Sequence, residues 1–209
     1  MKKFSYYKIL TYCSLLLFVI GFQSKNFALS EESKFATAAN LVKEKNYLDA
    51  FVIFEELAQT NDHEAQFNTA IFLKKGVGHP ANYALSLKWA WLAKLGGVEA
   101  ASNLIDEIIE FIPEDAINKI RFDVEKNLLK RMENGDIQVI LQMSEFYRTI
   151  AEEPDLQKSY ALGALAAALG VKGATIVRDE LEALIDGEQL ILGQGIAREL
   201  FRNNKWDFQ

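Results

Sequence analysis

The 209-residue chain has very little cysteine and histidine. Its single cysteine, Cys13, lies inside an apolar run near the amino terminus. One cysteine can form no intrachain disulfide and cannot supply the thiolate cluster of a zinc site. The two histidines, His63 and His79, stand in predicted turns, where we expect both to be solvated. No carboxylate spacing around them indicates a metal site, so we predict no bound metal, no cofactor and a fold stabilised by its apolar core alone.

Sequence motifs for catalysis and nucleotide binding are also missing. There is no Gly-x-Ser-x-Gly elbow, and neighbouring acids such as Glu55 and Glu56 point away from each other on a helix. Gly193 and Gly195 lie within a helical pattern, where we expect close helix packing or a kink rather than a dinucleotide loop. The formal net charge of -6 argues against a nucleic-acid partner. We therefore predict no catalytic residues and no enzymatic activity.

Proline is scarce, and its positions separate helical segments. Pro80, Pro113 and Pro154 are the only prolines, and each falls at a predicted break. No stretch alternates apolar and polar residues as a half-buried strand does. Apolar residues recur at helical spacing between glycine or asparagine stops. These patterns predict an all-α fold of antiparallel helix pairs at about residues 33–60, 63–96, 98–132, 136–169 and 171–203.

The first thirty residues have the pattern of a secretory signal peptide. Three lysines precede the largely apolar residues 9–22, and Ala28-Leu29-Ser30 places small residues where a signal peptidase cuts. The apolar run, about 14 residues, is short for a membrane span of about 20. We expect cleavage after Ser30, a single mature domain of residues 31–209, a periplasmic or secreted location in a bacterium, and no stable membrane span. The alternative is an uncleaved anchor.

One stretch of the chain occurs twice. Asn82–Ala101 aligns with Asp155–Ala174 at a shift of 73 residues and without a gap, so that Ser86 meets Ser159. Each copy reads as an amphipathic helix, a glycine stop and the beginning of the next helix. A long internal repeat of helix pairs is typical of an α-solenoid. We therefore predict stacked helix pairs in one continuous array.

These residues resemble the Sel-one-like repeat (SLR) family, which is related to the tetratricopeptide repeats. The resemblance covers nearly all of the mature chain and rests on Ala65-Gln66, Ala70, Leu73, Gly76, Gly78, Pro80, Lys88-Trp89, Leu92-Ala93 and Gly97, and again on Gly135-Asp136, Ser144, Tyr147, Pro154-Asp155, Ala166-Ala167 and Gly170. The second unit departs from the pattern because it lacks both loop glycines and has Leu162 in place of tryptophan. The resemblance implies a right-handed superhelix that binds other proteins, as in exported bacterial members. It implies packing roles for Ala70, Ser144 and Trp89, and no active site.

In stacks of this kind the first helix of each pair lines the concave surface. We expect partner contacts at positions of residues 64–75 and 137–150 that packing does not occupy. Trp91 is a further candidate because it is turned about 200° from Trp89 along the same helix, although it could instead pack under the next helix. The candidate partner-binding residues are Asn68, Phe72, Trp91, Gln142, Glu145 and Arg148.

Three functions are compatible with these observations. The first is an exported interaction module that binds another envelope protein or peptide through its concave groove. The second is a small-ligand-binding or enzymatic helical domain with a pocket between helix pairs. The third is a structural scaffold that associates with itself. The lack of a nucleophile, a metal cluster or a phosphate loop in the sequence favours the first.

Overall fold

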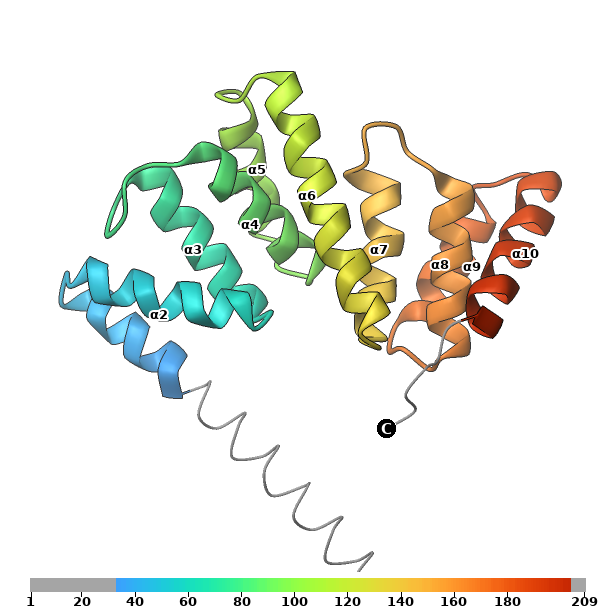
Figure 1. The fold of residues 1–209 in the computed structure, drawn as a ribbon, viewed down its shortest axis with the longest axis horizontal. Coiled ribbons are helices and arrows are strands. Elements are labelled where there is room, and N and C mark those ends of the chain that lie inside the picture. The colour runs from blue at the N-terminus through green and yellow to red at the C-terminus, as the bar shows by residue number, and fades with distance from the viewer. Residues whose placement is uncertain (1–32, 204–209) are drawn as a thin grey trace, which may run out of the picture.

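The computed structural model describes residues 33–203, and its regular secondary structure in this range is entirely helical. The predicted all-α class is therefore confirmed for this part of the chain. Residues 33–43 are helical, and they are followed by α2 (Tyr47–Gln59), α3 (His63–Lys75), α4 (Tyr83–Leu95), α5 (Ala101–Ile109), α6 (Glu114–Glu133), α7 (Gln138–Thr149), α8 (Leu156–Ala168), α9 (Ala174–Glu182) and α10 (Gly187–Asn203) (Figure 1). The predicted signal peptide and its cleavage after Ser30 lie outside the described residues. Within residues 33–203, no helix has both the length and the apolar character that crossing a membrane requires.

Side-chain caps define where several helices begin. The side chain of Asn82 accepts a hydrogen bond from the backbone N–H of Leu85 at the start of α4. The side chain of Asp155 accepts one from the N–H of Lys158 at the start of α8. Both caps satisfy a backbone donor that the first helical turn leaves without a partner. The two capping residues are 73 positions apart, so the repeat is visible in local structure as well as in sequence.

The same repeat organises the packing of the helices. Helix α4 packs against α3, α5 and α6, and α8 packs in the same way against α7, α9 and α10. Helix α6 joins the two four-helix units because it also packs against α7, as its place between α4 and α7 in Figure 1 shows. The described chain is thus a helical repeat protein in which α4 and α8 are the central helices of their units.

Buried serines hold the first two helices of each unit close together. Ser86 Oγ donates to the carbonyl oxygen of Ala70 at 2.6 Å, which ties α4 to α3. Ser159 Oγ donates to the carbonyl of Ser144 at 2.8 Å, and Ser144 Oγ donates to the carbonyl of Ser159 at 2.7 Å. These serines are fully buried, and a larger side chain at any of these positions would push the helices apart. The small residues that the sequence places on both helices therefore permit the contact.

The apolar core has two main parts that meet at α4. A smaller cluster is formed by residues 33–43, α2 and α3, and a larger one extends from α3 and α4 to α9. Trp89 packs against both clusters. Its indole Nε1 is buried and has no hydrogen-bond partner among the described residues. Trp89 thus fills the gap between helix pairs, the packing role implied by the resemblance.

Candidate functional site

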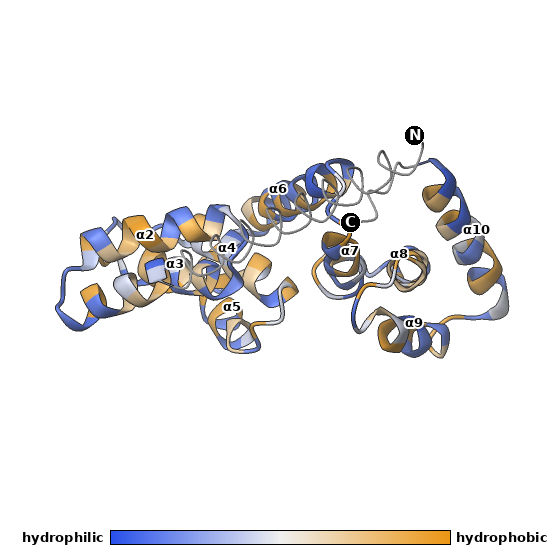
Figure 2. Cartoon of the chain, turned by 90° about the horizontal axis from the view of Figure 1, so that it is seen from below, coloured by the Kyte–Doolittle hydropathy of each residue, from blue (hydrophilic) through white to orange (hydrophobic). Residues whose placement is uncertain are grey.

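One face of α7 brings together three of the residues singled out in the sequence. Gln142, Glu145 and Arg148 are three residues apart along α7, so they lie on one side of it, and all three are half-buried. Figure 2 shows α5 and α9 projecting on the same side of the molecule with α7 between them. A pocket of about 410 Å³ opens there, lined by Lys94, Leu95, Gly97, Glu99, Leu141, Glu145, Arg148 and Val177. We call it the α7 pocket.

The charged groups of the α7 pocket are partly paired. Arg148 donates from Nε to Glu145 Oε2 at 2.8 Å, and its NH1 lies 3.5 Å from Glu180 Oε2 on α9. These contacts hold the guanidinium between α7 and α9. Lys94, in the last turn of α4, and Glu99, in the turn between α4 and α5, form no ion pair with another described residue. Within residues 33–203, the pocket therefore has one unpaired cation, Lys94, and one unpaired anion, Glu99, beside the apolar side chains of its wall.

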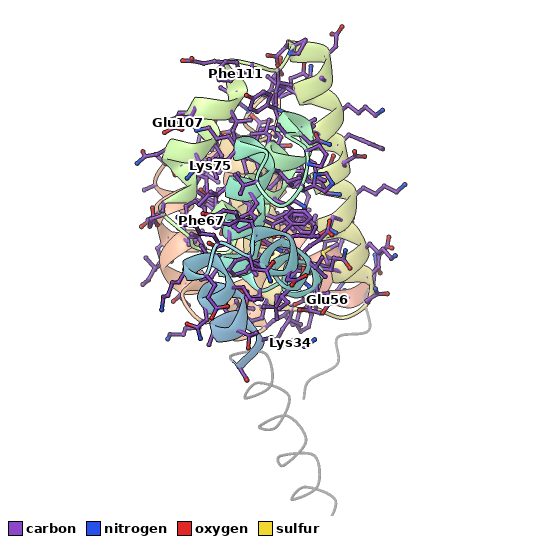
Figure 3. All side chains as sticks on the ribbon, turned by 90° about the vertical axis from the view of Figure 1, so that its left-hand side faces the viewer. Lys34, Glu56, Phe67, Lys75, Glu107 and Phe111 are labelled. Carbon is purple, nitrogen blue, oxygen red and sulfur yellow. The ribbon has the colours of Figure 1, made fainter. Side chains whose placement is uncertain are left out.

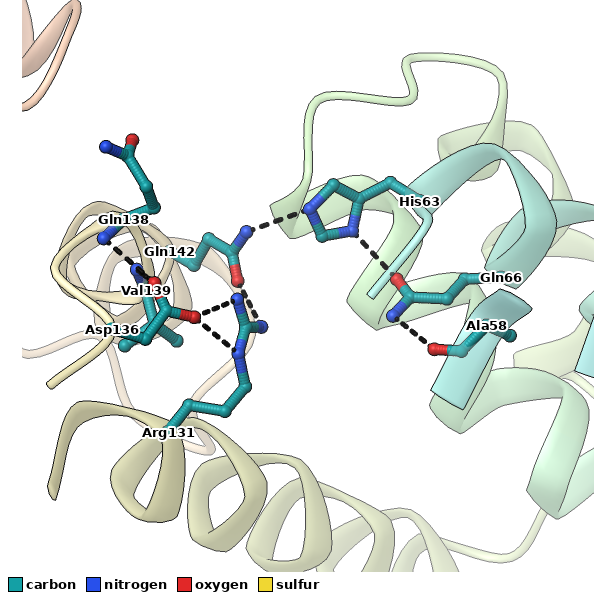
Figure 4. Close-up of polar contacts among 8 residues, drawn as sticks. All are labelled: Ala58, His63, Gln66, Arg131, Asp136, Gln138, Val139 and Gln142. Carbon is teal, nitrogen blue, oxygen red and sulfur yellow. Dashed lines mark hydrogen bonds and ion pairs between the residues drawn. The ribbon is translucent and has the colours of Figure 1, made fainter. Parts of the chain in front are cut away.

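A chain of polar contacts adjoins the α7 pocket and connects the first helices of the array to α7 (Figure 4). His63, the first residue of α3, contacts Gln66 through Nδ1 at 2.9 Å and Gln142 through Nε2 at 3.1 Å. Gln66 Nε2 donates to the carbonyl of Ala58 at 3.2 Å. At the other end Arg131 NH1 donates to Gln142 Oε1 at 2.8 Å. We call this chain the His63 relay.

The two ends of the His63 relay determine where its protons lie. Gln66 uses its amide N–H on a carbonyl, so its Oε1 faces His63 and must accept from Nδ1–H. Arg131 can only donate, so Gln142 accepts from it through Oε1 and presents its N–H to His63 Nε2. These contacts are all satisfied when His63 donates through Nδ1–H and accepts through Nε2. The expectation of a solvated turn residue is wrong for His63, because its half-buried ring contacts Gln66 and Gln142 and lies against Gly96.

This assignment makes a spectroscopic prediction. Long-range ¹H–¹⁵N NMR spectra of the protein at neutral pH should show Nδ1 of His63 protonated and Nε2 unprotonated. The Gln142→Glu variant replaces the donor facing Nε2 by a carboxylate that only accepts, so Nε2 can no longer accept from position 142 and its signal should change. His79 lies outside the relay, and its spectrum should not change. A wild-type signature with the proton on Nε2 would contradict the relay.

A second polar group joins α6, α7 and α8. The Tyr147 hydroxyl donates to Glu125, and Lys158 Nζ lies 3.8 Å from the centroid of the Tyr147 ring. Burial raises the pKa of Tyr147, and the hydrogen bond to Glu125 raises it further. The phenol therefore stays protonated in the folded protein at neutral pH and acts as a fixed donor. This group positions α7, whose opposite side carries the α7 pocket residues.

Two predicted contact residues are buried, so the prediction of a partner contact is wrong for them. Phe72 is only 7% exposed, and its ring lies 5.8 Å from that of Phe54 and 6.2 Å from that of Phe51. Helix α2 covers the face of α3 that was expected to line a groove. Trp91 is only 4% exposed, and the Arg121 guanidinium of α6 lies 5.9 Å from its ring centroid. It is covered because α4 has neighbours on both sides.

Asn68 stays apart from the other candidates. Its side-chain Nδ2 donates to the carbonyl of Glu64 in its own helix at 2.8 Å, and it does not line the α7 pocket. Sequence reasoning missed Lys94, Glu99 and Val177, which line the pocket from the end of α4, from the α4–α5 turn and from α9. The glycines that follow Lys94 mark that turn in the sequence, but nothing local indicates that it faces α7. In the described part of the chain, no group of His, Cys, Asp or Glu is placed to hold a metal ion.

Comparisons with known proteins find similarity among solved structures. No family model and no curated protein matches the chain. Among solved structures, the chain is similar to a protective antigen present in uropathogenic Escherichia coli strains that displays an SLR fold. The TM-score is 0.36 at 15% sequence identity, and the match covers 82% of this chain and 45% of that chain. The chain thus spans less than half the length of this neighbour.

Proposed function

We propose that this protein is an exported interaction module that binds an extended segment of another envelope protein in the α7 pocket. The observation that carries the proposal is the pocket itself. It has three walls from different parts of the array, with Leu95 on α4, Leu141 on α7 and Val177 on α9. Its volume of about 410 Å³ lies within the range that is typical of ligand-binding pockets.

The chemistry of the lining supports a peptide as the occupant. An extended peptide presents backbone donors and acceptors together with side chains on alternate sides. Lys94 can donate to a carbonyl and Glu99 can accept from an N–H, while the apolar wall can cover a side chain. Arg148 and Glu145 already neutralise each other, so they contribute shape more than net charge. The balance of two cations and two anions favours a segment without a strong net charge.

Two sequence features support the location and the class of protein. The signal-peptide pattern of residues 1–30 supports export across a bacterial inner membrane. The 73-residue repeat, seen in both the caps and the buried serines, supports an SLR-type array whose units present a continuous surface. Proteins built in this way present extended binding surfaces rather than a catalytic cleft.

Site-specific photocrosslinking tests the proposal in the protein's own compartment. A photoreactive phenylalanine analogue is placed at Val177 in the pocket and, as a control, at Phe122, which is exposed on α6. We expect one dominant protein adduct from position 177, mapped by mass spectrometry to a single segment, and none at position 122. The Lys94→Glu variant should lower the yield of that adduct by up to about tenfold. Its helical circular dichroism signal should be unchanged. An adduct of equal yield at position 122 would show that the pocket is not the binding site.

A further inference from the structure

A second pocket lies at the other ends of α4 and α5, away from the α7 pocket. It has a volume of about 480 Å³ and is lined by Lys74, Tyr83, Asp106, Glu107, Glu110 and Phe111. These residues come from the end of α3, the start of α4 and the end of α5. In Figure 3, Phe111 and Glu107 lie near each other in the upper part of the molecule. None of the six residues lines the α7 pocket.

Two aromatic rings form one wall of this second pocket. The rings of Tyr83 and Phe111 are stacked, with centroids 5.2 Å apart and planes at 17°. Stacking leaves them open, since Tyr83 is 38% and Phe111 62% exposed. Single exposed apolar residues are common on protein surfaces, but a stacked pair at the edge of a pocket offers a flat apolar platform. The negative faces of aromatic rings attract cations.

Carboxylates form the adjoining wall. Asp106 and Glu110 are four residues apart, as are Glu107 and Phe111, so the acids and the ring share one side of α5. Lys74 pairs with Glu107 and neutralises it. Asp106 and Glu110 form no ion pair with another described residue. The pocket thus combines an open aromatic surface with two carboxylates that no cation of the described chain neutralises.

We propose that this pocket binds an arginine side chain from the surface of a partner protein. A guanidinium is planar, stacks on an aromatic face and donates two parallel hydrogen bonds to a carboxylate, so it fits both walls at once. An anionic group would be repelled by Asp106 and Glu110, and a purely apolar group would leave them buried without a partner. The net charge of -6 also favours approach of a basic partner. The α7 pocket differs, because its charges balance.

The test uses residues 31–209, the mature form expected after cleavage, and the blocked tripeptide acetyl-Gly-Arg-Gly-amide. The comparison ligand carries citrulline, which keeps the planar shape of the arginine end group but has no charge and has a carbonyl acceptor in place of one NH2 donor. Binding is followed by ¹H–¹⁵N NMR. We expect concentration-dependent shifts centred on Tyr83 and on residues 106–111, and affinity for the citrulline peptide about tenfold weaker.

Matched variants separate the pocket from general surface effects. Phe111→Ala should weaken the arginine peptide about threefold, whereas Phe122→Ala, which removes an aromatic ring of equal exposure on α6, should not. The double variant Asp106→Asn and Glu110→Gln should weaken binding of the arginine peptide about tenfold.

Equal binding of the citrulline peptide, or shifts centred on Lys94 and Glu99, would overturn the assignment. Tighter binding of the free diamine putrescine than of the peptide would also overturn it, since the site would then take a small amine. This test is independent of the photocrosslinking test, because a negative result here does not change the adduct expected at position 177 in the α7 pocket.

Discussion

Replacing Trp91 by alanine is expected to lower the free energy of unfolding by about 3 to 5 kcal/mol. Trp91 is 4% exposed and belongs to the larger core cluster, so its removal leaves a cavity that the surrounding helices can only partly fill. The loss also removes the ring that faces the Arg121 guanidinium at 5.9 Å. Arg121 donates from Nε to the carbonyl of Ile150 at 2.9 Å and thereby connects α6 to the end of α7. The damage should therefore spread beyond α4.

Urea denaturation followed by far-ultraviolet circular dichroism measures this effect. The matched control is Phe122→Ala, which removes an aromatic side chain that is 62% exposed and should change stability by about 0.5 kcal/mol or less. Trp89→Ala should fall between the two, because Trp89 is only half-buried. If the midpoint for Trp91→Ala shifts no more than that for Phe122→Ala, Trp91 is exposed and the packing of α4 described above is wrong.

Adding a single methyl group at Gly193 is expected to have the second largest effect. Helix α10 approaches α8 so closely here that a Cβ at Gly193 would lie 2.7 Å from Tyr160 Cδ1 and 3.3 Å from the carbonyl oxygen of Gln157. The aromatic ring is itself buried, so it cannot turn away into solvent. Gly193→Ala should therefore lower the free energy of unfolding by about 1 to 3 kcal/mol through overpacking.

Gly195 provides the control for that substitution. It lies in the same helix two residues further on, and a Cβ there would meet no atom within 4 Å. Gly195→Ala should raise stability by up to about 1 kcal/mol, because alanine favours the helical conformation. The two variants are compared by thermal and urea denaturation. A stabilising effect at both positions would mean that α10 does not pack against α8 through Gly193.

The glycine pair shows how far local pattern can be taken. Its place inside a helical pattern predicts close packing or a kink, and the structure shows close packing at Gly193 only. Each glycine has one apolar and one polar neighbour in the sequence. What separates them is the presence of Tyr160 on one side of α10, which is a property of the tertiary arrangement. Sequence spacing could therefore identify the segment but not the residue.

The sequence contains a sign that Trp91 is buried, but it is overlooked if only one side of the helix is assumed to face the core. Between Tyr83 and Leu95 the polar side chains are confined to Ser86, Lys88 and Lys94, so α4 is apolar around most of its circumference. A helix that is apolar on all sides is buried on all sides. Assigning one inward stripe through Trp89 assumes a helix with a solvated back. That assumption is wrong for α4 because α3, α5 and α6 surround it.

The sequence by itself determined the helices, their caps and the repeat. These depend on residues within a few positions of each other, such as Asn82 and Leu85, and on an alignment of the chain with itself. Only the tertiary structure decided which faces remain open. His63 and Gln142 are in contact although they are 79 residues apart in the sequence. The α7 pocket is lined both by the turn after α4 and by α9. Contacts at such separations depend on how α6 orients the second unit against the first, and helical periodicity carries no information about that orientation.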